Sequence, residues 1–396
     1  MDVRGPRDLL RFFEELPDPR ADNLSHPLSS LMAITLLAVL STADDWVSVE
    51  SWAVANEAWL ATFLDLPHGI PSHDTVGRVF AALDPQRFEA CFRRWMAGMA
   101  LASGGKLIAI DGKTLRRSFE AAGGKAAIHM VSAWVQQNHA VLGQIQVADK
   151  SNEITAIPKL LEVLDLRGAT VTIDAMGCQK DIAAQIVAPE KGGHYLLAVK
   201  DNQPTLHEEV KLFLDEAIAG GWEHTGHSFH QEVEGDHGRV ETRRCWATGE
   251  IDWFQDAKDW PGFRSIVCVE SLREVMGGKA TTERRYYISS HDPRKPTTDA
   301  RFLLEAVRGH WGIENRLHWC LDVCFHEDQS RVRKQHGAQN FSRVRRLCLN
   351  LLRPAPAPGK KPDKKMSLKT KRFLCCCSRE YLLRVIAPLI QGVTTG

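Results

Sequence analysis

The spacing of hydrophobic residues predicts helices over roughly the first 100 residues. Apolar side chains recur near helical intervals at Leu31, Ile34, Leu37, Ala38 and Leu40. Ser72 or Asp74 can cap a later helix that runs to Leu83, and Asp84-Pro85 separates it from the next helix. Two short helices joined by a tight turn resemble a helix-turn-helix, although two packed helices with no role in DNA binding fit the pattern equally well.

From residue 104 the pattern changes to strands, which later alternate with helices. Three strand-like segments come first: Lys106–Asp111, Ile128–Gln136 and Ala140–Ala148. They are followed in turn by a helix, a strand, a helix, a strand and a helix: 153–164, 171–174, 180–188, 194–200 and 204–219. The order βββαβαβα predicts an α/β fold, with a mixed sheet that carries helices on its faces.

Residues 222–290 turn strand-rich again and are expected to form a β insertion. A long helix over about 298–324 and a final helix over 338–352 follow it. The predicted organisation is therefore an all-helical region over 1–100, an α/β region over 101–352 that contains the β insertion, and a basic linker and tail over 353–396.

Three acidic residues stand out because of where they fall in this pattern. Asp111 and Asp174 each end a short apolar strand, and Glu314 lies in the long helix. Each has an ordinary explanation on its own: Asp111-Gly112 is a turn signal, Asp174 can cap a helix, and Glu314 can be a surface residue. If the fold brings the three together, their oxygens form a site for hard divalent cations, which supports phosphoryl chemistry through two metal ions.

Basic and amide residues follow the same strands and helix. They form three groups: Lys113, Arg116 and Arg117; Lys200, Asn202 and Gln203; Arg331, Arg333 and Lys334. Phosphate backbones are bound by such donors, although each residue can also be an exposed charge without a ligand.

Charge is distributed unevenly, although the net charge is only +1. From Arg331 to the end there are 16 Lys and Arg against 2 Asp and Glu, a surplus of 14, and the rest of the chain has a deficit of 13. A basic block of this kind is typical of a segment that binds a polyanion. The block also fits a solvated, disordered tail, and its Pro- and Lys-rich stretch RPAPAPGKKPDKK (353–365) fits a flexible linker.

Composition favours a cytoplasmic protein that does not enter a membrane. The chain is 44% hydrophobic and 25% charged, and its longest apolar stretch, 28–40, is shorter than the ~20 residues that span a bilayer. No secretory signal is found at the charged N-terminus. The ten cysteines are scattered and expected to be reduced, and Cys375-Cys376-Cys377 lacks the spacing of a zinc site.

Several stretches together resemble the DDE transposases of bacterial insertion sequences, in particular the subfamily of the H-repeat-associated proteins. The resemblance runs from about residue 10 to 352. The matching stretches include PSHDTVGRVF (71–80), AIDGKTLRRS (109–118), KSNEITAIPKLLEVLDLRGATVTIDAMGCQK (150–180), YLLAVKDNQPTLHEEV (195–210) and HWGIENRLHWCLDVCFHEDQSRVRK (310–334).

The resemblance implies a ribonuclease H-like core with a β insertion, preceded by an all-helical transposase-associated domain. It places the catalytic and metal-binding acids at Asp111, Asp174 and Glu314, with two Mg²⁺ (or Mn²⁺) ions as cofactors. The implied activity is cleavage and strand transfer at the ends of an insertion sequence, with terminal repeats and target DNA as partners and a homodimer in the DNA complex.

The chain departs from the wider superfamily at two positions near the glutamate. An arginine four residues before it and a basic residue seven after it are common there, whereas this chain has His310 and Leu321. His310, Asn315 and His318 are the expected DNA contacts on this helix. Alternatives are a nuclease with the same core, a DNA-binding protein that no longer transposes, and a zinc site formed by His310, Glu314 and His318.

Overall fold

The computed structural model describes residues 13–20, 25–101, 107–119, 126–137, 139–147, 153–236, 238–275, 277–358 and 366–392. Its centre is a nine-stranded mixed sheet with the strand order β3-β2-β1-β4-β5-β9-β8-β7-β6. The first five strands in sequence are β1 (Leu107–Leu115), β2 (Ile128–Val135), β3 (Ala140–Val147), β4 (Thr170–Ile173) and β5 (His194–Val199). Strands β1, β2 and β3 form the expected antiparallel meander, and β4 pairs in parallel with both β1 and β5.

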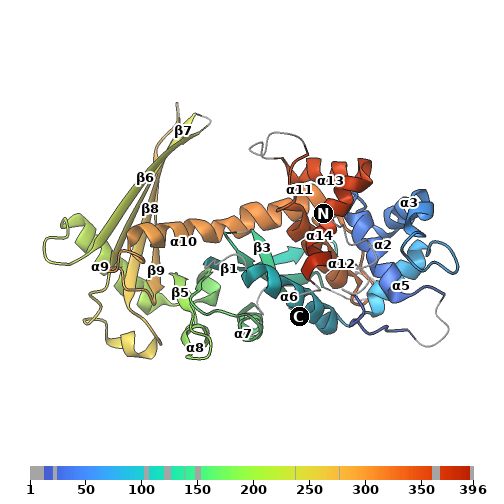
Figure 1. Cartoon of the computed structure of the whole chain (residues 1–396). Coiled ribbons are helices and arrows are strands. Elements are labelled where there is room, and N and C mark those ends of the chain that lie inside the picture. The colour runs from blue at the N-terminus through green and yellow to red at the C-terminus, as the bar shows by residue number, and fades with distance from the viewer. Residues whose placement is uncertain are drawn as a thin grey trace.

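The β insertion continues this sheet. Its strands are β6 (Ser228–Asp236), β7 (Arg239–Thr248), β8 (Ser265–Val275) and β9 (Thr281–Ser289). Strand β9 joins β5 in antiparallel pairing, and the remaining strands follow as hairpins. In Figure 1 these strands form an arm at one end of the molecule, away from the N-terminal helices.

Helices cover both faces of the sheet. The α10 helix (Ala300–Gly312) contacts β1, β4, β5, β6, β7 and β8 and so spans one face from the arm to the meander. Figure 1 shows α7 (Glu153–Val163) and α8 (Lys180–Val187) on the opposite side. The α9 helix (Pro204–Ala219) packs on β8 and β9. Helices and strands therefore alternate largely as the hydrophobic pattern predicts.

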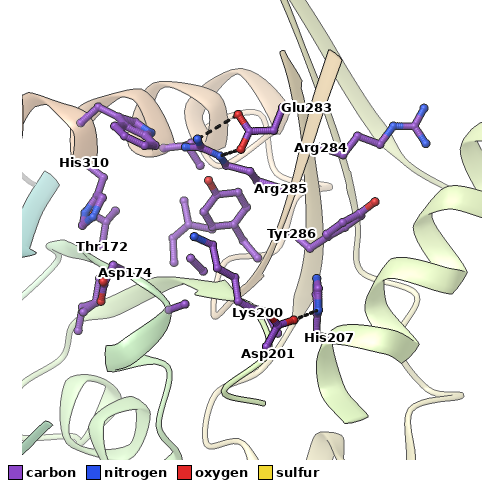
Figure 2. A pocket seen from close by; sticks show the side chains of 18 of the residues that line it. Thr172, Asp174, Lys200, Asp201, His207, Glu283, Arg284, Arg285, Tyr286 and His310 are labelled. Atoms are coloured by element: carbon purple, nitrogen blue, oxygen red, sulfur yellow. Dashed lines mark hydrogen bonds and ion pairs between the residues drawn. The ribbon is translucent and has the colours of Figure 1, made fainter. Parts of the chain in front are cut away.

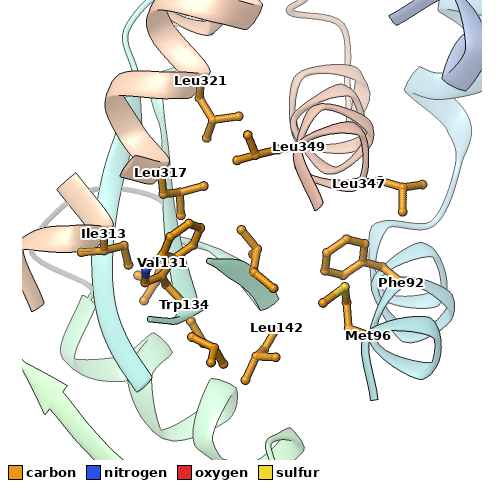
Figure 3. Packing of buried hydrophobic residues seen from close by; sticks show 14 of the residues in the cluster. Phe92, Met96, Val131, Trp134, Leu142, Ile313, Leu317, Leu321, Leu347 and Leu349 are labelled. Atoms are coloured by element: carbon orange, nitrogen blue, oxygen red, sulfur yellow. The ribbon is translucent and has the colours of Figure 1, made fainter. Parts of the chain in front are cut away.

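The N-terminal part consists of helices in the residues described. They are α2 (Leu28–Leu40), α3 (Trp46–Ala55), α4 (Glu57–Leu60), α5 (His73–Ala82) and α6 (Pro85–Leu101). These helices do not have a core of their own, because one continuous cluster of buried side chains joins them to the sheet. Figure 3 shows Phe92 and Met96 of α6 facing Leu142 of β3 and Leu347 of α12 (Gly337–Leu352).

The long helix that carries Glu314 is not regular. The sequence predicts one helix over about 298–324, but the structure has α10, then a π-helical turn (Ile313–His318), then α11 (Trp319–Phe325). A π-helical turn holds one more residue per turn than an α-helix, so it changes which side chains share a face. The directions in which the Glu314 and His318 side chains point therefore cannot be predicted from the sequence by assuming 3.6 residues per turn.

The prediction of a flexible basic tail is wrong for residues 366–392. Residues Leu368–Cys377 form α13 and Arg379–Gly392 form α14, and both helices pack against α12. Part of the basic surplus lies inside the protein, where Arg343 bonds Glu89 at 2.7 Å and Arg346 bonds Glu327 at 2.9 Å. Some of the excess positive charge of the C-terminal part therefore forms ion pairs with acids inside the protein.

No helix among the described residues is long and apolar enough to cross a membrane.

Candidate active site

The register of two parallel strands brings Asp111 and Asp174 to the same place in the sheet. Ile110 of β1 is paired with Ile173 of β4, and each aspartate is the next residue along its chain. Asp111 lies inside β1, which continues to Leu115 and pairs with β2, so Asp111-Gly112 is not a hairpin turn. Asp174 leaves the sheet and also caps a short 3-10 helix by accepting a hydrogen bond from the Met176 amide at 3.1 Å.

Glu314 reaches this region from the π-helical turn above the sheet. Its side chain and Asp174 line the same cleft. From the far end of the same turn, His318 Nδ1 lies 3.7 Å from Asp111 Oδ2. The turn thus places Glu314 in the cleft with Asp174 and places His318 beside Asp111. Such π-helical turns are found frequently at functional sites.

The neighbouring acids act on the ionisation of Asp111. Burial, together with the charges of Asp174, Glu314 and Glu153, raises the pKa of Asp111 to about 7, and the hydrogen bond from the Gly112 amide opposes this rise. A carboxyl group whose charge is disfavoured by burial and by nearby acids is one that a divalent cation would stabilise. All donors of the three acids are oxygen, which suits a hard cation.

In the described part of the chain, no three His, Cys, Asp or Glu side chains are gathered closely enough to form a metal site. This includes His310, Glu314 and His318, so the structure does not support the single-zinc alternative. The acids share a region of the molecule, but their oxygens are not drawn together around one point. The two-metal geometry therefore remains a prediction.

The cleft beside Asp174 and Glu314 has a volume of about 400 Å³. Figure 2 shows Asp174 and His310 on one side, with Lys200 and Arg285 on the side that faces them. The Arg285 guanidinium lies 4.3 Å from the centre of the Trp311 ring and is held by Glu283 at 2.8 and 3.1 Å. Acidic and basic groups therefore face each other across a space that can admit a phosphate-bearing strand.

The two histidines on the glutamate helix are not cationic. Burial lowers the pKa of His310 to about 4, and its Nδ1 lies 3.2 Å from Thr172 Oγ1. Burial, with the charges of Arg346 and Lys113, lowers the pKa of His318 to about 3. The expected contacts of these residues with DNA remain a prediction, in which neutral imidazoles would act by hydrogen bonding and not by charge.

Known proteins with similar sequences identify the family. A model described as "Transposase DDE domain" matches residues 102–351, and one described as "DDE_Tnp_1-associated" matches residues 10–96. The chain belongs to the DDE transposase family. It is 39% identical over 386 residues to the putative transposase YncI of Escherichia coli O157:H7, covering 96% of this chain and 95% of that one.

Two further relatives extend the comparison. The H repeat-associated putative transposase YhhI of Escherichia coli K12 is 36% identical over 390 residues, covering 96% of this chain and 98% of that one. An uncharacterized protein of the dhlA 3′ region of Xanthobacter autotrophicus is 47% identical over 285 residues, covering 71% of this chain and 93% of that one. The function of the chain as a transposase rests on these matches.

The transposase brings two of its three predicted basic groups together. Arg333 donates from Nε to the Arg117 carbonyl at 3.0 Å, across 216 residues of sequence, and stacks over Phe119 at 5.3 Å. Arg116 pairs with Asp328 at 3.2 Å but remains exposed. Arg331 and Lys334 are also exposed. We call the five cations the basic surface: Arg116, Arg117, Arg331, Arg333 and Lys334.

Lys113 does not belong to this surface. It is buried and bonds Asp322 at 2.6 Å and Asp328 at 3.0 Å, so the prediction that it contacts DNA is wrong. The reason is the continuation of β1 beyond Asp111, which turns Lys113 inward toward α11 and the turn that follows it. The ammonium group ties the strand of Asp111 to the helix beyond Glu314.

Asn202 and Gln203 brace the loop that carries Asp174. Asn202 donates to the Ala175 carbonyl at 2.6 Å, and Gln203 donates to the Cys178 carbonyl at 3.0 Å. The structure thus gives both amides a partner within the transposase, whereas Lys200 lines the cleft. Asn315 is exposed on the π-helical turn, beside Glu314.

Sequence reasoning missed a buried pair next to Asp111. His129 Nε2 lies 2.5 Å from Glu153 Oε1, and the two side chains are 3% and 4% exposed. A Cβ atom at Gly112 would collide with both of these side chains. The Asp-Gly sequence is therefore needed for close packing rather than for a turn. The sequence offered one indication of this pair, the acidic residue Glu153 at the start of the predicted helix 153–164.

Proposed function

We propose that this transposase cleaves and joins DNA at the ends of an insertion sequence by using Asp111, Asp174 and Glu314 to hold two divalent cations, Mg²⁺ or Mn²⁺. The observation that carries the proposal is the pairing of Ile110 with Ile173, which places two acids side by side, below a third on the π-helical turn. The order β3-β2-β1-β4-β5 around these acids supports a ribonuclease H-like core.

The three acids would act as metal ligands. When bound, such a cation pair activates the attacking water or hydroxyl and stabilises charge on the leaving oxygen. The raised pKa of Asp111 supports this role, because a carboxyl group that is costly to ionise alone gains most from a nearby cation. Lys113, through Asp322, and Asn202, through the Ala175 carbonyl, keep the ligand-bearing segments in place.

The DNA would lie across the cleft and the basic surface. Lys200 and Arg285 face the acids across the cleft, where they can neutralise phosphates on either side of the reacting one. The basic surface begins just after β1, at Arg116 and Arg117, and would offer further contacts to the DNA backbone. Such contacts position a duplex and do not read its sequence.

Sequence recognition is assigned to the N-terminal helices. The α5 and α6 helices form two helices joined by a tight turn, with Arg78 and Arg87 exposed. Asn340 of α12 donates to the Phe80 and Leu83 carbonyls at 2.9 Å each, so the end of α5 is fixed to α12. We infer that this pair reads the terminal repeats and that two copies of the chain assemble on DNA.

The test is cleavage of a DNA fragment that carries the inverted repeats flanking this gene. The expected result is nicking at the repeat ends in Mg²⁺ or Mn²⁺, with joining to a target plasmid. Cleavage without joining would favour the alternative of a nuclease with the same core. Binding of the repeats with no cleavage in any divalent cation would favour a protein that no longer transposes.

A further inference from the structure

The C-terminal helices α13 and α14 are joined to the rest of the protein by both polar and apolar contacts. Side chains of α14 enter the main hydrophobic cluster: Tyr381, Leu382, Val385, Ile386 and Leu389. Lys371 of α13 is buried and donates to the Leu352 and Arg353 carbonyls at 2.8 Å each, at the end of α12. A positive charge there also favours the helix dipole. These helices lie beyond the part of the chain that the family model matches.

Arg372 connects three separate segments from a buried position. Its Nε and Nη2 donate to the Val39 carbonyl in α2 at 3.2 and 2.7 Å. Its Nη2 also donates to Asp44 Oδ1 at 2.9 Å, and its Nη1 donates to the Cys324 carbonyl in α11. The guanidinium plane lies 4.3 Å from the centre of the Phe325 ring. All three guanidinium nitrogens therefore have partners, as a rigid planar fork allows.

Asp44 completes the connection from the other side. Its Oδ2 lies 2.7 Å from His326 Nδ1, and His326 is the residue at which α11 ends in a left-handed conformation with φ of 49°. The backbone carbonyl of Asp44 accepts a hydrogen bond from Arg345 of α12 at 3.2 Å. The end of α11 is thus held by Arg372 through the Cys324 carbonyl and by Asp44 through the terminating residue His326.

The held helix is the one that follows Glu314. Residues 313–325 run as a π-helical turn and then α11 without interruption, so a shift of the end of α11 is transmitted to the turn. π-Helical hydrogen bonding is rare and needs support from its surroundings. The contacts of Arg372 and Asp44 fix the end of this segment at α11, while His318, the last residue of the π-helical turn, lies beside Asp111.

We propose that the C-terminal helix pair is a positioning element of the active site, in which Arg372, through Asp44 and the Cys324 carbonyl, fixes α11 and thereby the direction of Glu314. The pair is not a DNA-binding arm in this view, because its Lys371 and Arg372 side chains are buried and bind partners inside the protein. The inference rests on the proposed catalytic role of Glu314.

The test compares full-length variants in the cleavage assay. Arg372→Ala removes the connection, and Arg384→Ala removes the same charge from an exposed residue of α14 whose partner is Glu380. Arg372→Ala is expected to lower kcat on the order of a hundredfold, as a small misplacement of a catalytic group does, with KM for DNA unchanged. Arg384→Ala should leave both unchanged. Hydrogen exchange should become faster in residues 319–325 of Arg372→Ala and stay unchanged in β1 and β4.

Two further variants cover the cases in which this comparison is ambiguous. Arg372→Ala can fail to fold, so Asp44→Asn, which keeps the shape of Asp44, should show a smaller fall in kcat in the same direction. A wild-type kcat in a folded Arg372→Ala variant, or in Asp44→Asn, would overturn the inference. So would an equal rise of KM for DNA in Arg372→Ala and Arg384→Ala, because it would show that both residues bind DNA. Glu314→Gln separates the two claims: if it cleaves at the wild-type rate, the proposed function itself fails, and if it is inactive while Arg372→Ala is normal, only the positioning role fails.

Discussion

His318 Nδ1 lies 3.7 Å from Asp111 Oδ2, so the helical segment that carries Glu314 touches the strand that carries the first acid. This contact joins parts of the chain separated by about 200 residues. It depends on the π-helical turn, in which His318 is the last residue. The neutral imidazole contacts Asp111 without adding charge, which leaves the carboxylate available to a cation. The site is therefore assembled by tertiary packing around one short irregular turn.

Asp174→Asn is expected to abolish metal-dependent cleavage and to retain DNA binding. The substitution removes a proposed cation ligand but leaves the basic surface intact, and the amide oxygen can still accept the hydrogen bond from the Met176 amide. Cleavage and gel-shift assays on the same DNA fragment measure the two effects separately. A variant that cleaves near the wild-type rate would remove Asp174 from the mechanism.

Asp111 makes the stability of the metal-free protein depend on pH. Its pKa is raised from the ordinary 3.8 to about 7, mainly by burial, so between these values the folded protein holds a proton that the unfolded chain has lost. The stability contributed by this proton is complete below about pH 4 and is lost as the pH rises through 7. Relative to Asp111→Asn, the wild type should lose a few kcal/mol between pH 4 and 8.

Urea unfolding in EDTA at several pH values measures this difference. Asp111→Asn serves as the reference because it lacks the titrating group but keeps the other ionisable groups. Parallel pH profiles for the two proteins would show that Asp111 is not perturbed. Mn²⁺ or Mg²⁺ should restore stability to the wild type above pH 7 and have less effect on the variant.

The basic surface should account for part of the salt dependence of DNA binding. Replacing Arg331 and Lys334 together by alanine is expected to weaken binding to any sequence and to reduce the slope of log affinity against log salt by roughly 1 per cation that contacts a phosphate. Arg384→Ala is the control for loss of an exposed charge elsewhere. A slope equal to that of the wild type would place the DNA away from this surface.

Gly112→Ala should destabilise the protein by about 1–3 kcal/mol, the usual effect of overpacking. The added methyl group would collide with the His129–Glu153 pair, which is buried and cannot move aside into solvent. Gly235→Ala is a suitable control, because its nearest neighbour would be 4.0 Å away. Equal urea midpoints for the two variants would contradict the close packing of this pair on β1.

The sequence was sufficient to predict the strand meander, the alternation that follows it and the neighbouring strands that carry Asp111 and Asp174. These features follow from local hydrophobic periodicity and from the pairing of parallel strands. The sequence was not sufficient for the position of Asp111 within its strand or for Lys113, because the prediction ended the strand at Asp111. The alternation that turns Lys113 inward could be applied only once β1 was known to continue to Leu115.

The C-terminal region shows a second limit. Arginine is rarely buried, so Arg343, Arg346 and Arg372 were counted as surface charge. Each is buried because an acid distant in sequence meets it: Glu89, Glu327 and Asp44 respectively. No local pattern indicates such partners. The π-helical turn is a third case, since regular helical periodicity continues on both sides of it and gives no sign of the extra residue.

Iron-directed cleavage of the protein backbone tests most directly whether the three acids form one metal centre. Fe²⁺ bound in place of Mg²⁺, with ascorbate and peroxide, cuts the chain close to where it is held, and the fragments can be mapped by mass spectrometry. The account predicts cuts near residues 111, 174 and 314 in the same sample, suppressed by excess Mg²⁺ and lost in Asp174→Asn. Cuts confined to one of the three segments, or a pattern unchanged by the substitution, would contradict a shared site.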